Sequence, residues 1–451
     1  MMKQQTCQTY HKINNGLFFR NTLIPLLFVL LFSCTQKKRQ PAISNKNISE
    51  VITKMTEIMV HDITNPPLGA RFFSYACLAG YEIVSQNDSK FKSMHGILNS
   101  YPQIKKPGSF QSADYRLGAL LAMMEMSSKM QPSGKLMEAY EKKFLDSCKK
   151  AGIDDGLLNN SKSYAQAISG QILAYANSDG YNKISNLSRY TPLKTEGSWY
   201  PTPPGYLAPV EPNFNTVRPF TLDSAAQFKP PPPLVYSAKA GSPFYRSVSA
   251  VYKEGKELRE DHRAIASFWD CNPFAMQDEG HLMFGFKKIS PGAHWLGITG
   301  IACLQRKKSF EETMFIYTIV SVGLMDANIT CWDEKYRSNR IRPETAIRRL
   351  IDPQWAPLLQ TPPFPEYTSG HSVVSASSAV ILTHFFGDNF SYKDSVEVTY
   401  DIPARHFGSF NQAAEEAAIS RFYGGIHYMD AIVEGQHEGR KVGEWVLQKI
   451  K

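Results

Sequence analysis

Four basic side chains fall within the eight residues of segment 335–342, directly ahead of Pro343. Lys335 and Arg342 are seven positions apart, so a helix over this segment would place them on one face, two turns apart. Two fixed cations could then converge on one anion. A charge run of this kind is more often a solvated helix face, so the segment alone does not establish a site.

A second segment, 365–372, leads directly into an apolar stretch that predicts a helix. Free backbone N–H groups at a helix start, the Ser369 hydroxyl and the small Gly370 would together suit an anion, with His371 at the rim. The alternative is an ordinary helix N-cap by Ser369 or Ser372, with a surface histidine.

A third segment, 420–430, contains Arg421, a glycine pair and His427. The planar guanidinium of Arg421 suits oxyanions, and the glycine pair predicts the end of a helix just before His427. Taken alone, this segment could also be a turn with an incidental histidine.

In this order, the three segments resemble the K-x(6)-R-P, P-S-G-H and S-R-x(5)-H motifs of the superfamily that contains vanadium-dependent haloperoxidases and type 2 phosphatidic acid phosphatases. The matching residues are Lys335, Arg342, Pro343, Ser369, Gly370, His371, Ser420, Arg421 and His427. Segments 199–219, 230–233 and 290–295 also resemble the bacterial haloperoxidase-like branch. Two positions depart from the pattern: Thr368 replaces the usual proline, and Asp430 follows His427 by three positions instead of four.

The resemblance implies a vanadate cofactor with His427 as its single covalent protein ligand. The groups implied to hold its oxygens are those of Lys335, Arg342, Ser369, Gly370 and Arg421. His371 would contact the cofactor and deprotonate hydrogen peroxide, and Lys335 would polarise the peroxide before a halide attacks it. An exported haloperoxidase that oxidises halide to hypohalous acid is the function that this resemblance favours.

Neighbouring residues bear on the choice of halide. Trp332 and Phe364 resemble the chloroperoxidase arrangement, whereas the chain length and the wording of 366–369 resemble bacterial iodoperoxidases. We therefore favour iodide and leave bromide open. Phe274, His281 and His294 could line the cavity, although packing is the preferred interpretation for each.

Two acids could support the site. Asp270 could orient an arginine, but an ion pair with a structural role is the preferred interpretation. Asp430 is the candidate partner of His427, and its spacing makes that hydrogen bond doubtful.

Two other functions stay open at this point. In an exported acid phosphatase, His427 would be the nucleophile and His371 the acid for the leaving group. Such phosphatases are usually shorter or cross the membrane several times, and we expect no apolar span after residue 33. A non-catalytic, oxyanion-binding surface lipoprotein would have lost at least one of the matched groups, and none is missing.

The elements that must position these residues are helices. Apolar stripes at helical spacing predict helices at 48–63, 70–84, 115–126, 135–148, 164–175, 245–257, 258–269, 293–304, 310–328, 372–386, 411–422 and 431–449. No convincing strand pattern appears, so the predicted fold class is all-α. Between them, 191–233 is rich in proline and aromatic residues and predicts an ordered strap over the helices.

We expect an export signal at 1–33, a polar tether at 34–47 and a single all-α domain at 48–451, divided into N-terminal helices (48–190), the strap (191–233) and a C-terminal catalytic bundle (234–451). The apolar run 23–32 ends at Cys34, which resembles a bacterial lipobox and predicts an exported protein whose Cys34 carries a lipid in the inner or outer membrane. A cleaved signal peptide without lipid is the alternative.

The remaining composition narrows the class of protein. The net charge of +9 on 451 residues is too diffuse to predict nucleic-acid binding. The five cysteines after Cys34 form no C-x-x-C pair, which indicates neither a disulfide framework nor a zinc ribbon. The sequence does not indicate an oligomeric state.

Overall fold

The computed structural model describes residues 43–108, 112–278, 283–285 and 288–451, all within one compact unit. The expected export signal and Cys34 lie outside these residues, as does His281. The all-α class is confirmed, with thirteen α-helices in the described part of the chain. Two antiparallel pairs of short strands were not expected: β1 (Met276–Asp278) with β2 (Met283–Gly285), and β3 (Tyr392–Asp394) with β4 (Arg405–Phe407). Three residues are too few to produce a readable alternation.

Three of the five N-terminal helices begin at a side-chain cap, and all five end within a few residues of the expected limits, although the fifth begins well before the expected residue 164. They are α1 (Asn45–His61), α2 (Pro66–Ser85), α3 (Tyr115–Met130), α4 (Gly134–Lys150) and α5 (Asp155–Asn177). Asn65, Asp114 and Asp154 each accept a hydrogen bond from a backbone N–H of the first turn of α2, α3 and α5. A short 3₁₀ turn, η1 (Tyr181–Asn186), follows α5.

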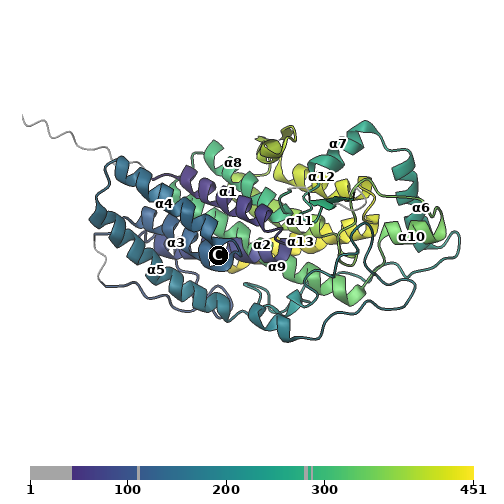
Figure 1. Cartoon of the computed structure of the whole chain (residues 1–451), viewed down its shortest axis with the longest axis horizontal. Helices are drawn as coiled ribbons and strands as arrows, with labels where there is room; N and C mark the ends of the chain where they lie inside the picture. Colours follow the sequence, from purple (N-terminus) through teal and green to yellow (C-terminus); the bar gives the residue numbers. More distant parts are fainter. Residues whose placement is uncertain (1–42, 109–111, 279–282, 286–287) are drawn as a thin grey trace, which may run out of the picture. The chain divides into compact units, whose positions relative to one another are not determined.

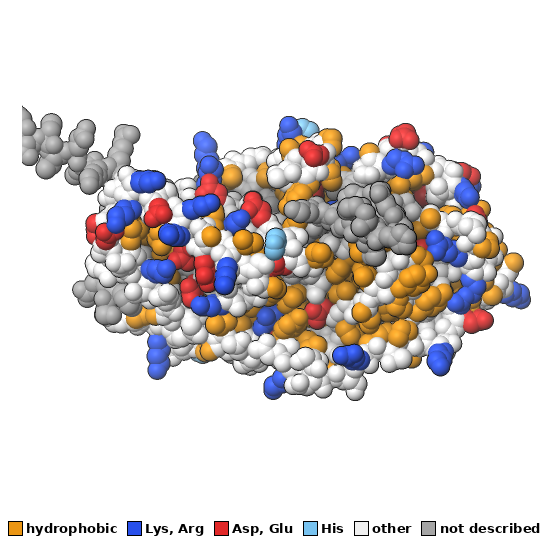
Figure 2. All heavy atoms as spheres, in the orientation of Figure 1, with side chains coloured by type: hydrophobic (Ala, Val, Ile, Leu, Met, Phe, Trp, Pro, Cys, Tyr) orange, Lys and Arg blue, Asp and Glu red, His pale blue; other side chains and the backbone are white. Residues whose placement is uncertain are grey.

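The helices of the second half are α6 (Pro243–Lys256), α7 (Glu260–Phe268), α8 (Pro291–Gln305), α9 (Phe310–Ser338), α10 (Pro343–Leu350), α11 (Gly370–Phe386), α12 (Phe410–Tyr423) and α13 (Met429–Lys449). In Figure 1, α3 to α5 lie toward one end of this unit and α6 and α10 toward the other. Figure 2 shows charged side chains crowded over the first of these ends and hydrophobic side chains spread over the other half of the same face. Helix α10 was not predicted, because its apolar stripe is only two turns long.

Helix α9 is the central element and packs against α2, α8, α11 and α13. By length and composition it could cross a membrane, so the expectation of no apolar span after residue 33 is wrong. Its most apolar window is 94% buried among the other helices. The apolar surface of α9 is therefore covered by the bundle itself.

Helices α11 and α13 approach each other closely because α13 presents a row of glycines. A Cβ atom on Gly439 would lie 2.2 Å from the carbonyl oxygen of Val373, and one on Gly435 would lie 3.0 Å from that of Ser369. Since Ser369 precedes α11 and His427 precedes α13, this close packing fixes the starts of both helices relative to each other.

The proline-rich segment 191–233 is bound to the helices along its length. Trp199 N donates to Asn339 O at 2.8 Å, and the buried Phe220 N donates to the Asp326 carboxylate at 2.7 Å. A 3₁₀ turn, η2 (Phe214–Thr216), contacts α9. Nearby, Trp332 Nε1 donates to the carbonyl of Val210, so the segment also contacts the functional residues.

Candidate active site

The three motif segments meet at one end of α9. The condition for Lys335 and Arg342 to share a helix face, a helix over 335–342, is not met, because α9 ends at Ser338. Asn339 adopts the left-handed conformation (φ 53°), and Pro343 starts α10. Lys335 therefore approaches from the last turn of α9, and Arg342 from the cap of α10.

Three cations are buried around this point, with exposed fractions of 0% for Lys335, 0% for Arg342 and 1% for Arg421. Lys335 Nζ donates to the carbonyls of Pro365, Glu366 and Thr368. Burial lowers the pKa of Lys335 to about 8 and that of Arg342 to about 10. Among the described residues, Arg342 Nη2 and Arg421 Nε are buried and have no hydrogen-bond partner. Buried donors without partners favour the binding of an anion at this site.

His427 is held by contacts that agree on its tautomer. Its Nδ1 lies 2.8 Å from Glu366 Oε1, which can only accept, and its Nε2 lies 3.1 Å from Arg342 Nη1, which can only donate. The proton is therefore on Nδ1, and Nε2 carries the lone pair. Burial, followed by the charges of Arg342 and Lys335, lowers the pKa of His427 well below its usual value.

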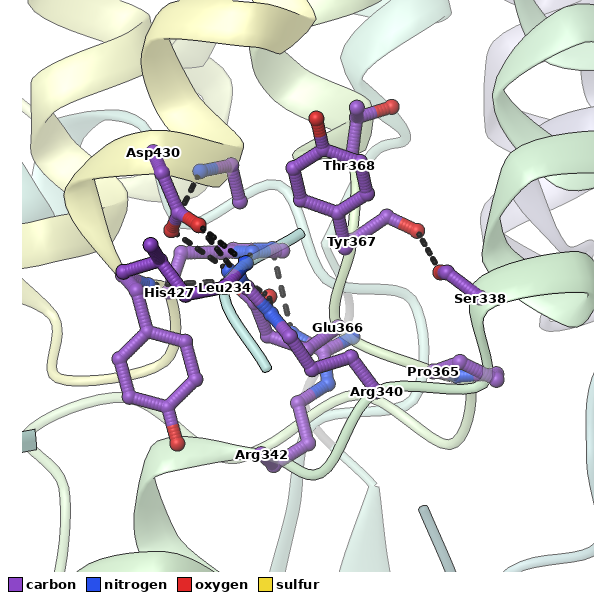
Figure 3. A network of polar contacts seen from close by, with 12 residues as sticks. Leu234, Ser338, Arg340, Arg342, Pro365, Glu366, Tyr367, Thr368, His427 and Asp430 are labelled. Atoms are coloured by element: carbon purple, nitrogen blue, oxygen red, sulfur yellow. Dashed lines mark hydrogen bonds and ion pairs between the residues drawn. The ribbon is translucent and has the colours of Figure 1, made fainter. Parts of the chain in front are cut away.

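The acid beside His427 is Glu366, a residue that the sequence analysis did not select. Its Oε1 also accepts from Tyr428 N at 3.0 Å, and its Oε2 accepts from Arg340 Nε at 2.6 Å. Figure 3 shows Arg340 in contact with both Glu366 and Asp430. Asp430 does not reach His427, because its carboxylate pairs with Arg340 instead. An acid inside a segment otherwise suited to anions was the signal that could have identified Glu366.

His371, on the first turn of α11, is a second neutral imidazole. Its Nε2 lies 3.0 Å from the carbonyl oxygen of Trp269, so Nε2 carries the proton and Nδ1 is the basic nitrogen. Burial, followed by the charge of Arg421, lowers its pKa well below the usual value. Arg421 Nη1 donates to the same carbonyl. One backbone atom thus orients both groups.

The loop before α11 combines an N-cap with the site. Ser369 accepts from Ser372 N and is fully buried, and His371 is partly buried rather than on the surface. Thr368 donates to Glu438 Oε2 at 2.7 Å, a contact that proline could not make. The departure at Thr368 therefore adds an anchor to the turn.

One cavity opens onto these residues. Its lining includes His371, His427, Arg421, Gly370, Trp332, Phe364, Phe274 and Cys271. Lys335 and Arg342 lie behind this wall, each with its cation about 5 Å from the centre of the Phe364 ring (5.0 and 5.1 Å). Aromatic side chains thus separate part of the cationic cluster from the open cavity.

The supporting residues divide between two roles. Asp270 forms an ion pair with Lys288, as the structural interpretation predicts. It also lies 3.9 Å from Arg421 Nη2, where it can orient that arginine. His294 is fully buried beside the cavity wall, in contact with Cys271 rather than among the lining residues.

Comparisons with known proteins agree with this geometry. Residues 315–451 match a family model described as the VCPO second helical-bundle domain. The crystal structure of the first bacterial vanadium-dependent iodoperoxidase is 44% identical, covers 91% of this chain and 98% of its own, and has a TM-score of 0.86.

Two bacterial vanadium-dependent chloroperoxidase structures share the fold. The apo form covers 86% of this chain and 95% of its own, and the holo form 91% and 96%; both are 14% identical with a TM-score of 0.63. No curated protein matches the chain. The identity and coverage of the iodoperoxidase place this chain in the vanadium-dependent haloperoxidase family.

Proposed function

We propose that this chain binds vanadate at His427 and uses hydrogen peroxide to oxidise halide to hypohalous acid, with iodide as its preferred halide and bromide as a slower substrate. The observation that carries the proposal is the buried positive charge of Lys335, Arg342 and Arg421 around His427, whose Nε2 carries the lone pair. Of the acids in the described chain, Glu366 alone bonds directly to His427. Such an excess of buried cations matches a compact, highly charged oxyanion.

The residues fit vanadate in donor type as well as in charge. His427 Nε2 would be the ligand, because Glu366 fixes the proton on the other ring nitrogen. Arg342 Nη2 and Arg421 Nε, which have no partner among the described residues, would hold the oxygens together with the Ser369 hydroxyl and the Gly370 N–H. Bound vanadate would supply Lewis-acid activation of peroxide without a change of oxidation state.

His371 is suited to accept the proton of hydrogen peroxide. Its Nδ1 carries the lone pair, because Nε2 donates to Trp269 O, and its lowered pKa keeps the ring neutral. It lines the same cavity as His427. Lys335, held by the carbonyls of Pro365, Glu366 and Thr368, would supply a fixed positive charge that polarises the peroxide.

The preference for iodide rests on the cavity walls and on the relative. Trp332, Phe364 and Phe274 give the cavity an aromatic lining, which suits a large and weakly hydrated halide. Iodide is also the halide that is easiest to oxidise. The 44% identical protein is described as an iodoperoxidase.

Reconstitution tests the proposal. Metal-free protein is incubated with orthovanadate, and triiodide formation, bromination of an indicator dye and p-nitrophenyl phosphate hydrolysis are followed in parallel with and without peroxide. We expect vanadate-dependent iodide oxidation that exceeds bromide oxidation, and no phosphate ester hydrolysis. Ester hydrolysis without halide oxidation would instead establish the phosphatase. The absence of both activities would favour the non-catalytic oxyanion-binding protein.

We also propose that the chain is exported and carries a lipid on Cys34, on the support of the sequence pattern alone. Expression of the full-length chain with a radiolabelled fatty acid tests this. Label should enter the wild type and be lost in Cys34→Ser. Equal labelling of both chains would overturn the proposal.

A further inference from the structure

A second polar cluster lies beside the cavity and has no part in the proposed chemistry. It consists of Cys271 after α7, His294 on α8, Asp394 on β3 and Glu397 in the 3₁₀ turn η3 (Val396–Tyr400). All four side chains are buried. Cys271, His294 and the pair Asp394 and Glu397 come from three separate parts of the sequence and meet only through the fold.

Three of these side chains offer one ligand atom each to a common point. Cys271 Sγ lies 3.5 Å from His294 Nδ1 and 3.4 Å from Glu397 Oε1, and the last two atoms are 3.2 Å apart. Ligands at zinc–sulfur, zinc–nitrogen and zinc–oxygen bond lengths in a tetrahedron are separated by about 3.3 to 3.6 Å. The three observed separations therefore come close to those of three corners of a zinc tetrahedron.

The remaining nitrogen of the histidine is also arranged as in metal sites. His294 Nε2 lies 2.8 Å from Asp394 Oδ2, and Asp394 Oδ1 accepts from Val396 N at 3.1 Å. A carboxylate on the second nitrogen directs the first toward a metal and strengthens it as a ligand. In the described part of the chain, neither Asp394 nor Glu397 forms an ion pair with lysine or arginine, so the cluster has negative charge to share with a cation.

We propose that Cys271, His294 and Glu397 bind a zinc ion, with Asp394 orienting His294. A thiolate, an imidazole and a carboxylate are all ligands that zinc accepts, and three protein ligands leave a fourth position for water. Cys271 also lines the cavity, which provides a route for the ion.

The zinc site anchors the wall of the oxyanion pocket. Cys271 follows Trp269 by two residues, and the Trp269 carbonyl accepts hydrogen bonds from His371 and Arg421. The Trp269 ring also stacks on His294, with centroids 4.7 Å apart. Fixing Cys271 and His294 to one ion therefore fixes the backbone atom that orients both groups.

Metal analysis of the full chain tests the site without vanadate or halide, so its outcome is independent of the haloperoxidase proposal. The protein is purified without chelators, equilibrated with zinc, freed of excess metal and analysed by mass spectrometry. We expect about one zinc ion per chain in the wild type and in Cys303→Ser, and almost none in Cys271→Ser or His294→Ala. Cys303 is an equally buried cysteine on α8, outside the metal-ligand cluster, and is the matched control.

Cobalt substitution identifies the ligand. A thiolate–cobalt charge-transfer band should appear in the wild type and vanish in Cys271→His. Because histidine is also a zinc ligand, Cys271→His should still bind zinc, and it replaces Cys271→Ser in the test if that variant does not fold. Asp394→Asn should bind zinc roughly 10- to 100-fold more weakly. A wild type without zinc, or without the cobalt band, would overturn the proposal and leave a metal-free network in which His294 bridges two acids.

Discussion

His427 and His294 are both buried histidines that lie 2.8 Å from a carboxylate oxygen, yet the surroundings favour a neutral ring at His427 and a protonated ring at His294. Arg342, Lys335 and Arg421 face His427, and with burial they lower its pKa. Burial also opposes a charge on His294, but Asp394 and the cluster around it raise the pKa of that ring well above its usual value.

The comparison shows that one carboxylate partner does not decide the charge of a buried histidine. The remaining charges around the ring decide it. A cationic surrounding leaves a neutral imidazole ready for an oxyanion, and an acidic surrounding favours a cation, whether a proton or a metal ion. The two sites lie on either side of one short segment, 269–271.

Removal of His427 should have the largest effect, because it removes the proposed vanadium ligand from the cationic site. His427→Ala should reduce both vanadium binding and iodide oxidation to background, because it removes the lone-pair nitrogen that lies beside Arg342. Vanadium is measured by mass spectrometry after equilibration with orthovanadate. His437→Ala, which removes an exposed histidine of α13, is the control and should bind normally. Full vanadium occupancy in His427→Ala would refute the ligand assignment.

Glu366→Gln tests the carboxylate on that side. The amide can no longer hold the Nδ1 proton of His427 as an anion does, so vanadate affinity should fall roughly 10- to 100-fold. Titration with orthovanadate, monitored by iodide oxidation at saturating peroxide, measures the change. The amide keeps the size of the side chain, and an unchanged affinity would show that Glu366 is only a packing residue.

Glu438 is an acid near the cationic site of His427. Its pKa shows whether burial or the neighbouring positive charges have the larger effect on a carboxyl group there. Burial raises its pKa to about 7, although Thr368 and Thr330 donate to it. The folded chain keeps this proton at pH values where the unfolded chain releases it, so stability falls as pH rises from about 4.5 to about 7.

Between about pH 5 and pH 8, the wild type should therefore lose roughly 2–3 kcal/mol of unfolding free energy relative to Glu438→Gln. Urea unfolding at a series of pH values measures the difference. Glu444→Gln, on the exposed face of α13, should run parallel to the wild type. If the curve of Glu438→Gln also ran parallel to that of the wild type, the pKa of Glu438 would not be raised in the folded chain.

Asp430→Asn should have the smallest effect. Asp430 acts on His427 only through Arg340 and Glu366, and its side chain is 25% exposed. We expect vanadate affinity to fall roughly threefold or less. A loss as large as that of Glu366→Gln would show that the whole network acts as one unit.

The sequence predicted the helices and the three motif segments well, because apolar spacing and the motif residues are local signals. It could not decide whether Lys335 and Arg342 lie on one helix, since nothing in the spacing reveals that Asn339 turns left-handed. The aromatic residues 332, 364 and 274 do line one cavity.

Contacts between distant segments escaped prediction. Glu366 meets His427 across 61 positions, and His294 meets Asp394 across 100. Neither pair has a spacing rule, because both depend on how α11 and α13, or α8 and β3, pack. Asp430 has the more suggestive position in the sequence, yet its carboxylate pairs with Arg340.

The shared acceptor at Trp269 is a main-chain oxygen, so no side-chain substitution at that position deletes it. Mutational drift at residue 269 can change the ring and leave the hydrogen bonds to His371 and Arg421 in place. A displacement of this peptide, in contrast, would move the proton acceptor and one of the oxyanion-binding cations together. The base His371 and the cation Arg421 are therefore positioned together by one main-chain carbonyl, which no amino-acid substitution at residue 269 removes.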